Sequence, residues 1–251
     1  MIKPGLVSIT FRNLSVQEIS GLAAKSGLVG IEWGGDVHVP HGDVGAARKV
    51  RKLTVDAGLE VASYGSYYRC DDDISFGDVL KTAVALEAPL IRVWAGTKGS
   101  ASTTAEERAR IVENVRRIAD KAAREGVRIA FEYHGKTLTD DVISAAQLLQ
   151  EVAHTNVYTY WQPLPPHTLD ERLSGLERVK PWLANLHVFS WTDKGERLPL
   201  VEGEELWRRY FSLIRDLPQQ RYALIEFVKG NEPEQLLDDA RTLRRWLAEI
   251  L

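Results

Sequence analysis

The sequence is poor in cysteine and in long hydrophobic runs. One cysteine, Cys70, stands among 251 residues, so no intramolecular disulfide can form and nothing indicates an oxidising compartment. The apolar run that follows Pro4 and Gly5 is too short for a membrane span or for the apolar core of a secretion signal. We therefore expect a cytoplasmic protein with no membrane partner.

An excess of either charge is also missing. The chain has 32 basic and 35 acidic residues and a formal net charge of −3. A charge this small gives no field that would attract a nucleic-acid backbone, so nucleic acid is not an expected partner. The hydrophobic fraction of 44% and charged fraction of 27% are typical of a soluble globular protein with a full core.

The sequence contains short apolar, β-branched runs that alternate with longer amphipathic stretches. Strands are predicted at 6–10, 29–33, 59–64, 90–94, 127–132, 156–160, 184–189 and 222–227, and helices near 15–26, 43–57, 73–87, 103–125, 139–153, 168–179, 203–216 and 232–250. Ser15 and Glu18 have the spacing of a capping box at a helix start. Gly27, Gly58 and Gly126 stand where a helix ends before the next strand.

Apolar strands that are each followed by a helix need cover on both faces, which indicates a parallel sheet. The first strand–helix junction, SITFRNLSVQE, lacks the glycine fingerprint of a dinucleotide-binding sheet. Eight such units predict one closed (β/α)8 TIM barrel that spans residues 1–251.

Polar residues gather at the predicted carboxyl ends of these strands, where barrels carry their chemistry. They are Glu32, Tyr64, Arg69, Arg92, Lys98, Glu132, His134, Gln162, His187 and Glu226. A lone buried carboxylate needs a cation or keeps its proton. Two carboxylates, an imidazole and an amide oxygen at one mouth could share a divalent ion; alternatively, each glutamate pairs with an arginine such as Arg92 or Arg197.

The order of Glu132, a ligand after the sixth strand, His187 and Glu226 resembles the xylose isomerase-like superfamily of TIM barrels. The stretches GIEWGGDVHVP and RVWAGTKGS are also similar to its sugar phosphate isomerases and epimerases and its 3-dehydroshikimate dehydratases. The resemblance spans nearly the whole chain. The superfamily's endonuclease IV group uses several more histidines and aspartates to hold three zinc ions, and the six histidines of this chain are too dispersed for that role.

The resemblance implies one Mn²⁺, Mg²⁺, Co²⁺ or Zn²⁺ ion bound by Glu132, Gln162, His187 and Glu226. The family's second ligand is an aspartate, whereas the stretch VYTYWQPLPP places Gln162 there. An amide oxygen can bind a hard cation but adds no negative charge, so the affinity should fall. Pro165 occupies a position that is often histidine in the epimerases, and His167 is a possible replacement.

The resemblance further implies proton transfer through an enediolate, with Glu132 and Glu226 as acid and base. His134 completes an E-x-H pattern found in the dehydratases and is either an acid–base group or an orienting group. The leading hypothesis is a metal-dependent sugar or sugar-phosphate isomerase or epimerase. The alternatives are a dehydroshikimate dehydratase-like lyase and a metal-free sugar-binding barrel, which Gln162 favours.

Substrate contacts are expected from two kinds of side chain. Arg92, Lys98 and Arg197 could bind a phosphate or carboxylate, although Lys98 could equally be a solvated loop charge. Flat apolar faces suited to a sugar ring are expected from Trp33, Trp94, Trp161 and Trp191. Glu32, Tyr64 and His38 are further candidates; His38 and His41 have only weak metal-pair spacing, and His154 is expected to be structural. A homo-oligomer is also possible, because relatives commonly pair through surface helices.

Overall fold

The computed structural model describes residues 1–71, 75–164 and 167–250. Eight parallel strands close into a barrel in chain order, as predicted. The strands are β1 (Ile2–Val7), β2 (Gly30–Gly34), β3 (Glu60–Arg69), β4 (Leu90–Trp94), β5 (Arg128–Phe131), β6 (Val157–Trp161), β7 (Leu183–Val188) and β8 (Arg221–Ile225). The chain is therefore a single-domain (β/α)8 TIM barrel.

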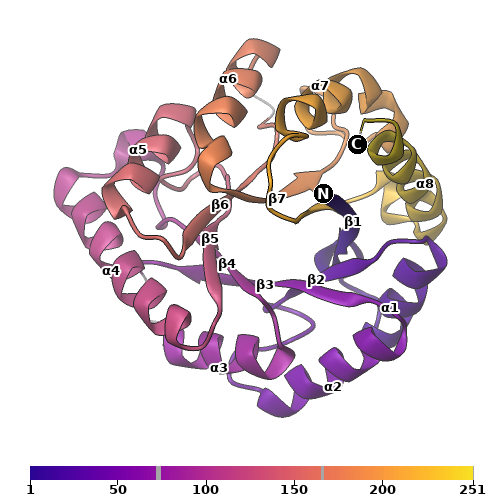
Figure 1. The fold of residues 1–251 in the computed structure, drawn as a ribbon, viewed down its shortest axis with the longest axis horizontal. Coiled ribbons are helices and arrows are strands. Elements are labelled where there is room, and N and C mark those ends of the chain that lie inside the picture. Colours follow the sequence, from indigo (N-terminus) through magenta and orange to yellow (C-terminus); the bar gives the residue numbers. More distant parts are fainter. Residues whose placement is uncertain (72–74, 165–166, 251) are drawn as a thin grey trace.

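A ring of helices surrounds the barrel (Figure 1). The α-helices are α1 (Val16–Lys25), α2 (Val44–Asp56), α3 (Phe76–Leu86), α4 (Ala105–Arg124), α5 (Val142–Val152), α6 (Leu169–Val179), α7 (Glu204–Ile214) and α8 (Pro233–Ile250). Short 3-10 turns cover η1 (Ser8–Phe11), η2 (Ser100–Ser102), η3 (Lys180–Trp182), η4 (Leu200–Gly203) and η5 (Lys229–Asn231). No helix within the described ranges is long and apolar enough to cross a membrane.

Local capping explains where several helices start and end. Ser15 and Glu18 form the predicted capping box at α1, and Gly27 after that helix has a φ of 71°. Glycine has no Cβ, so its backbone adopts this left-handed conformation at little cost. Asp141 accepts hydrogen bonds from the Ile143 and Ser144 backbone at the start of α5. These caps fix the lengths of the loops that carry the site.

The first strand differs from the prediction. A strand was expected at 6–10, in the apolar run after Pro4 and Gly5, yet β1 begins at Ile2, and Pro4 O accepts a hydrogen bond from Val29 N at 2.9 Å. Residues 8–11 instead form the buried turn η1. Within it, Thr10 Oγ1 accepts a hydrogen bond from Phe227 N at 3.0 Å. The turn therefore anchors the loop that follows β8.

The amino-terminal end of the barrel is closed by packing and by an ion pair. Lys3 Nζ lies 2.7 Å from Glu60 Oε1, and the Tyr222 hydroxyl donates to the same carboxylate. Above this end, small and aromatic side chains from several strands form one apolar cluster that includes Ala62, Leu90 and Tyr160. These described residues fill the amino-terminal end and the middle of the barrel.

Candidate active site

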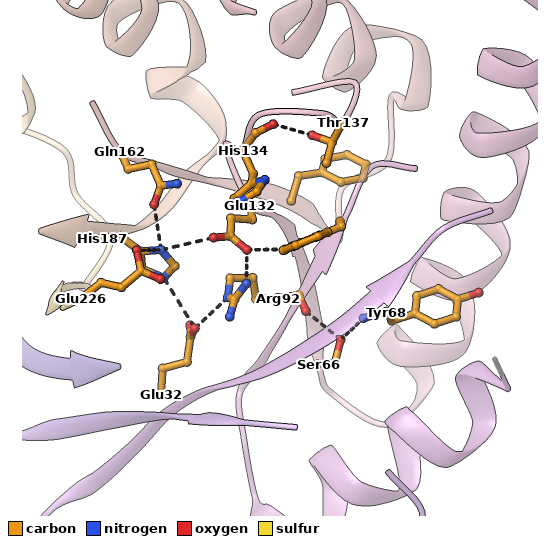
Figure 2. A network of polar contacts seen from close by, with 12 residues as sticks. Glu32, Ser66, Tyr68, Arg92, Glu132, His134, Thr137, Gln162, His187 and Glu226 are labelled. Carbon is orange, nitrogen blue, oxygen red and sulfur yellow. Dashed lines mark hydrogen bonds and ion pairs between the residues drawn. The ribbon is translucent and has the colours of Figure 1, made fainter. Parts of the chain in front are cut away.

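Four potential ligand atoms meet at the carboxyl-terminal end of the barrel. His187 Nδ1 lies 2.9 Å from Gln162 Oε1, 3.4 Å from Glu226 Oε2 and 3.7 Å from Glu132 Oε1 (Figure 2). Ligand atoms of Glu132, His187 and Glu226 all lie within 4.8 Å of one another, and these three residues are buried. The structure thus brings together the four residues that the sequence predicted as metal ligands.

The strands set this convergence. His187 lies within β7 and is fully buried, while Glu132, Gln162 and Glu226 each directly follow a strand. The Glu226 backbone N–H donates to Val188 O at 3.0 Å, and Glu132 N donates to Val93 O at 2.9 Å. These bonds extend the ladders by one residue, so the carboxylates start from fixed backbone positions.

The geometry and the donor set fit a divalent ion. Metal–ligand bonds of about 2.0–2.2 Å place neighbouring ligand atoms about 3.0–3.5 Å apart, close to the separations around His187 Nδ1. Carboxylate and amide oxygens with one imidazole suit Mg²⁺, Mn²⁺ or Zn²⁺. Glu132, Gln162, His187 and Glu226 would hold the ion.

A buried ion-pair network lies beneath this cluster. Arg92 Nε donates to Glu32 Oε1 at 2.7 Å, and Arg92 Nη1 donates to Glu132 Oε2. The Trp94 indole N–H donates to that same Glu132 oxygen. Ser63 Oγ donates to Glu32 Oε2 at 2.7 Å. Glu132 therefore has one oxygen committed to protein donors and one that faces His187.

The alternative that each glutamate pairs with an arginine holds for Glu132 and not for Glu226. Arg92 is the partner of Glu132. The charged contact found for Glu226 within the described ranges is the His187 imidazole. Arg197 does not reach it, since its guanidinium bonds Asn231 and lies 4.1 Å above the Phe227 ring.

Burial and charge shift the pKa values in opposite directions. Burial alone would raise the Glu32 pKa, but Arg92 and His187 outweigh it and hold that pKa well below its usual value. Burial raises the pKa of Glu226, and the nearby Glu132 charge adds to the rise against the opposing pull of His187. Burial would lower the His187 pKa, but Glu226 and Glu32 raise it. The surroundings thus favour the anionic form of Glu32 and the protonated form of Glu226.

Room for the ion pair comes from Gly65 on β3. A Cβ atom there would lie 2.7 Å from Arg92 Nη2 and 2.9 Å from Glu32 Oε1. We expect Gly65→Ala to lower the free energy of unfolding by about 1–3 kcal/mol, because overpacking displaces the buried pair. Urea unfolding measures the change. Gly21→Ala is the matched control, since its Cβ would meet nothing within 4 Å; equal effects at both sites would contradict the explanation.

A pocket of about 540 Å³ opens above the cluster. Aromatic rings dominate its wall. It is lined by Ile9, Arg12, Tyr67, Trp94, Glu132, His134, Gly135, Lys136, Asp140, Gln162, Leu164, His167, Phe189, Trp191, Glu226 and Phe227. The catalytic candidates Glu132, Glu226 and His134 therefore share one pocket with the predicted contacts Trp94 and Trp191.

Three predicted substrate contacts lie elsewhere and need correction. Trp33 is fully buried and donates to Thr54 Oγ1 on α2 at 3.0 Å. Tyr64 is fully buried and donates to Val39 O at 2.8 Å. Trp161 packs against Trp207 and Tyr210 of α7. Successive residues of a strand face opposite sides, and these three side chains point outward, toward the helices.

Other predicted contacts also lie outside the pocket wall. Glu32 and Arg92 form the buried pair below it, and Lys98 pairs with Glu107 at 2.6 Å. His38 Nδ1 lies 2.9 Å from Ser8 Oγ, and its ring meets the edge of Trp33. Among the lesser candidates, His41, Arg69 and His154 contact Ser66 O, the Trp94 ring and Asp120, respectively. Pro165 lies outside the described residues.

Sequence reasoning missed part of the pocket wall. The missed residues are Ile9, Arg12, Tyr67, Gly135, Lys136, Asp140, Leu164, Phe189 and Phe227. Some had an available signal, because Phe189 and Phe227 are the last residues of two predicted strands, close to His187 and Glu226. Lys136 and Tyr67 had none, since their positions depend on a left-handed backbone conformation.

We expect Gln162→Asp to tighten divalent-ion binding about tenfold, because it adds a negative charge to the ligand set. Titration calorimetry with Mn²⁺ measures the affinity. Gln219→Asp is the control, since it adds the same charge at an exposed residue. Unchanged or weaker Mn²⁺ binding by Gln162→Asp would show that Gln162 does not face an ion.

The barrel with a carboxylate–imidazole cluster at its carboxyl-terminal end defines a class of protein, and the sequence matches that class. Residues 21–249 match the family described as xylose isomerase-like TIM barrel. The chain belongs to this family. A 3-dehydroshikimate dehydratase of Bacillus anthracis is 25% identical over 284 residues, which cover 100% of this chain and 99% of that protein.

Solved structures show the same fold. The "probable 3-DHS dehydratase" of Bacillus anthracis aligns with a TM-score of 0.81 at 22% identity, over 97% of this chain and 99% of that one. A D-psicose 3-epimerase has a TM-score of 0.71 at 17% identity, covering 100% and 99% of the two chains. A 3-keto-D-glucoside 4-epimerase from E. coli has a TM-score of 0.73 at 16% identity, covering 98% and 99%.

Proposed function

We propose that this protein is a divalent-metal-dependent lyase that removes water from a hydroxylated cyclic keto acid of the 3-dehydroshikimate type. The observation that carries the proposal is the position of the Glu132 carboxylate, which Arg92 and Trp94 hold through one oxygen. The full-length similarity to a 3-dehydroshikimate dehydratase supports the substrate class.

Epimerisation by two carboxylates requires a free acid–base group on each face of the substrate. Glu132 does not meet this requirement, because Oε2 accepts two hydrogen bonds and Oε1 faces His187. Glu226 lines the pocket and accepts no hydrogen bond from a backbone or neutral side-chain donor within the described ranges. Elimination of water needs one base and one acid, which the site offers.

His134 is placed to be the acid. Its ring lies flat against Trp94, with centroids 4.5 Å apart, and Nδ1 lies 2.6 Å from Gly135 O. With Nδ1–H donating to that carbonyl, Nε2 is the ring nitrogen left for substrate, and it carries a proton to give when the ring is an imidazolium. The stack and the hydrogen bond fix the ring orientation, so Nε2 faces the substrate from a defined place.

The elimination needs two proton movements. Glu226 removes the proton from the carbon next to the ketone, and the electron pair forms a carbon–carbon double bond as the hydroxyl on the following carbon leaves. His134 gives a proton to that departing hydroxide, which leaves as water. The ring dienone then becomes aromatic when a proton is lost from the remaining ring CH2 and one is gained by the ketone oxygen. A divalent ion held by the candidate ligands would stabilise negative charge on the ketone oxygen. Arg92 keeps Glu132 in position throughout.

A sugar or sugar-phosphate isomerase or epimerase is the second candidate. This candidate is favoured because Glu132 and Glu226 both line the pocket. Proton transfer through an enediolate would again use Glu226 as the base. The metal-free binding barrel is a third candidate, and Gln162 favours it because the amide adds no charge to the ligand set.

The test is to incubate the purified protein with 3-dehydroshikimate and Mg²⁺ or Mn²⁺ and to follow the ultraviolet absorbance of an aromatic product. A ketose panel in deuterated water runs in parallel, because epimerisation exchanges a carbon-bound proton. Aromatic product that disappears on chelation supports the lyase. Deuterium exchange into a ketose without aromatic product would replace the lyase proposal with the epimerase. If neither substrate reacts and the purified protein binds no metal, the metal-free binding barrel is favoured.

A further inference from the structure

Backbone strain is concentrated around the pocket. Among the described residues, the non-glycine residues with positive φ are Tyr67, Glu87, Lys136, Ala153, Phe227 and Asn231. Glu87 and Ala153 end helices α3 and α5. Of the other four, Tyr67, Lys136 and Phe227 all line the pocket. Large side chains adopt this conformation at a cost, and such residues cluster where their side chains are used.

Lys136 is the one of these three that carries a charge. It lies on the loop between β5 and α5, four residues after Glu132, and its φ is 61°. Its ammonium forms no hydrogen bond or ion pair with the described part of the chain. The nearby pocket acid Asp140 instead accepts the Ser100 backbone N–H, at 3.2 Å from both carboxylate oxygens.

The other strongly basic residues around the pocket are engaged. Arg12, which also lines it, donates to Asp36 Oδ2 at 2.6 Å. Arg69 lies above the Trp94 ring at 4.1 Å, and Arg197 bonds Asn231. The floor, by contrast, carries the carboxylates of Glu132 and Glu226. An anionic group of a substrate would be repelled from the floor and attracted to the Lys136 ammonium, while Asp140 on the same loop is engaged by the Ser100 N–H.

We infer that Lys136 binds the carboxylate of the substrate and sets the preference of this site for an anionic ring over a neutral sugar. This inference rests on the proposed function and names the residue that reads the acid group. The aromatic wall, including Trp94, Phe189 and Trp191, suits the flat faces of such a ring. The left-handed backbone at Lys136 places this exposed residue at the pocket wall, where its ammonium can reach a bound anion.

The test compares two ligands that differ only by a carboxylate, 3,4-dihydroxybenzoate and catechol, in the presence of Mg²⁺. Binding is followed by titration calorimetry or by the fluorescence of Trp94 and Trp191, which line the pocket. The wild-type protein should bind the acid at least tenfold more tightly than catechol. Lys136→Met should abolish that preference by weakening binding of the acid far more than binding of catechol, and Lys136→Arg should keep most of it.

Lys121→Met, at an exposed lysine on α4, is the matched control and should leave the preference intact. A preference that persists in Lys136→Met overturns the inference. A Lys136-dependent preference for D-ribulose 5-phosphate over D-ribulose, without one for the carboxylate, overturns the carboxylate assignment in favour of a phosphate. A Lys136-dependent carboxylate preference in a protein that does not dehydrate 3-dehydroshikimate supports the inference and removes the proposed reaction.

The stability of the same loop provides a second readout. Lys136→Gly and Lys136→Asn relieve the left-handed backbone, so both should raise the melting temperature while they weaken binding of the acid. If Lys136 had a purely structural role, these substitutions would lower the melting temperature and leave binding of the acid unchanged. A lowered melting temperature with unchanged binding of 3,4-dihydroxybenzoate would therefore overturn the inference.

Discussion

Replacing Glu226 by glutamine is expected to lower kcat for 3-dehydroshikimate about 10³-fold, since general-base help typically contributes 10²–10⁴-fold. The amide cannot accept the carbon-bound proton, whereas its size keeps the pocket shape. Glu226 is the pocket carboxylate that Arg92 and Trp94 do not bind, and it lies 3.4 Å from His187 Nδ1. Steady-state kinetics at saturating Mg²⁺ measures the change.

Glu205→Gln on α7 is the control for loss of one charge, because this glutamate is exposed and far along the chain from the candidate ligands. Metal titration of Glu226→Gln separates loss of the base from loss of the ion, since the amide oxygen keeps some ability to bind a cation. If the variant with bound ion kept more than a tenth of the wild-type kcat, the base would be another group, and His134 would be the next to test.

Replacing Arg92 by methionine is expected to lower the free energy of unfolding by about 3–5 kcal/mol, the usual effect of removing one partner from a buried ion pair. The substitution leaves Glu32, which is fully buried, without its guanidinium partner, and it frees the committed oxygen of Glu132. Urea unfolding at pH 7 measures the change.

The loss caused by Arg92→Met should shrink between pH 7 and pH 5. In the wild-type protein Arg92 holds the Glu32 pKa low. The stabilisation from this ion pair is therefore fully present above the Glu32 pKa of the unfolded chain, and it is lost only as the pH falls through the lower Glu32 pKa of the folded protein. Without Arg92, burial raises the Glu32 pKa, and a neutral Glu32 removes part of the penalty.

Two variants show whether the buried position of Arg92 is responsible. Arg92→Lys keeps the charge but loses the two-sided guanidinium contact, so an intermediate loss is expected. Arg241→Met, which removes an exposed arginine paired with Asp238 at 2.9 Å, should cost about 0–1 kcal/mol. A loss in Arg92→Met no larger than in Arg241→Met would contradict the role assigned to the network.

The barrel could be predicted from the sequence because its signals are local. Apolar runs, capping residues such as Ser15 and Glu18, and glycines such as Gly27 each act within a few positions of the chain. The four candidate ligands could also be predicted, since a barrel brings the carboxyl ends of its strands together whatever the loops do. The family resemblance selected these four among the polar residues at the strand ends, and the structure places them around His187 Nδ1.

The direction of individual side chains could not be predicted in the same way. The pairing of β2 with β3 shifts between Ile31 and Glu32, where Ile31 pairs with Val61 and Glu32 pairs with Ser63. This irregularity sets which side chains face inward, so Glu32 enters the interior while Trp33 and Tyr64 face the helices. Such a shift depends on contacts across the sheet and leaves no clear mark in the sequence.

The contacts of Arg92 have an evolutionary consequence. This one guanidinium joins three strands, with partners 60 positions earlier and 40 positions later in the chain. Loss of the arginine alone leaves buried carboxylates uncompensated, and loss of either glutamate alone leaves excess positive charge. Descendants that abandon the arginine should therefore have exchanged Glu32 in the same lineage, and the three positions should covary among homologues.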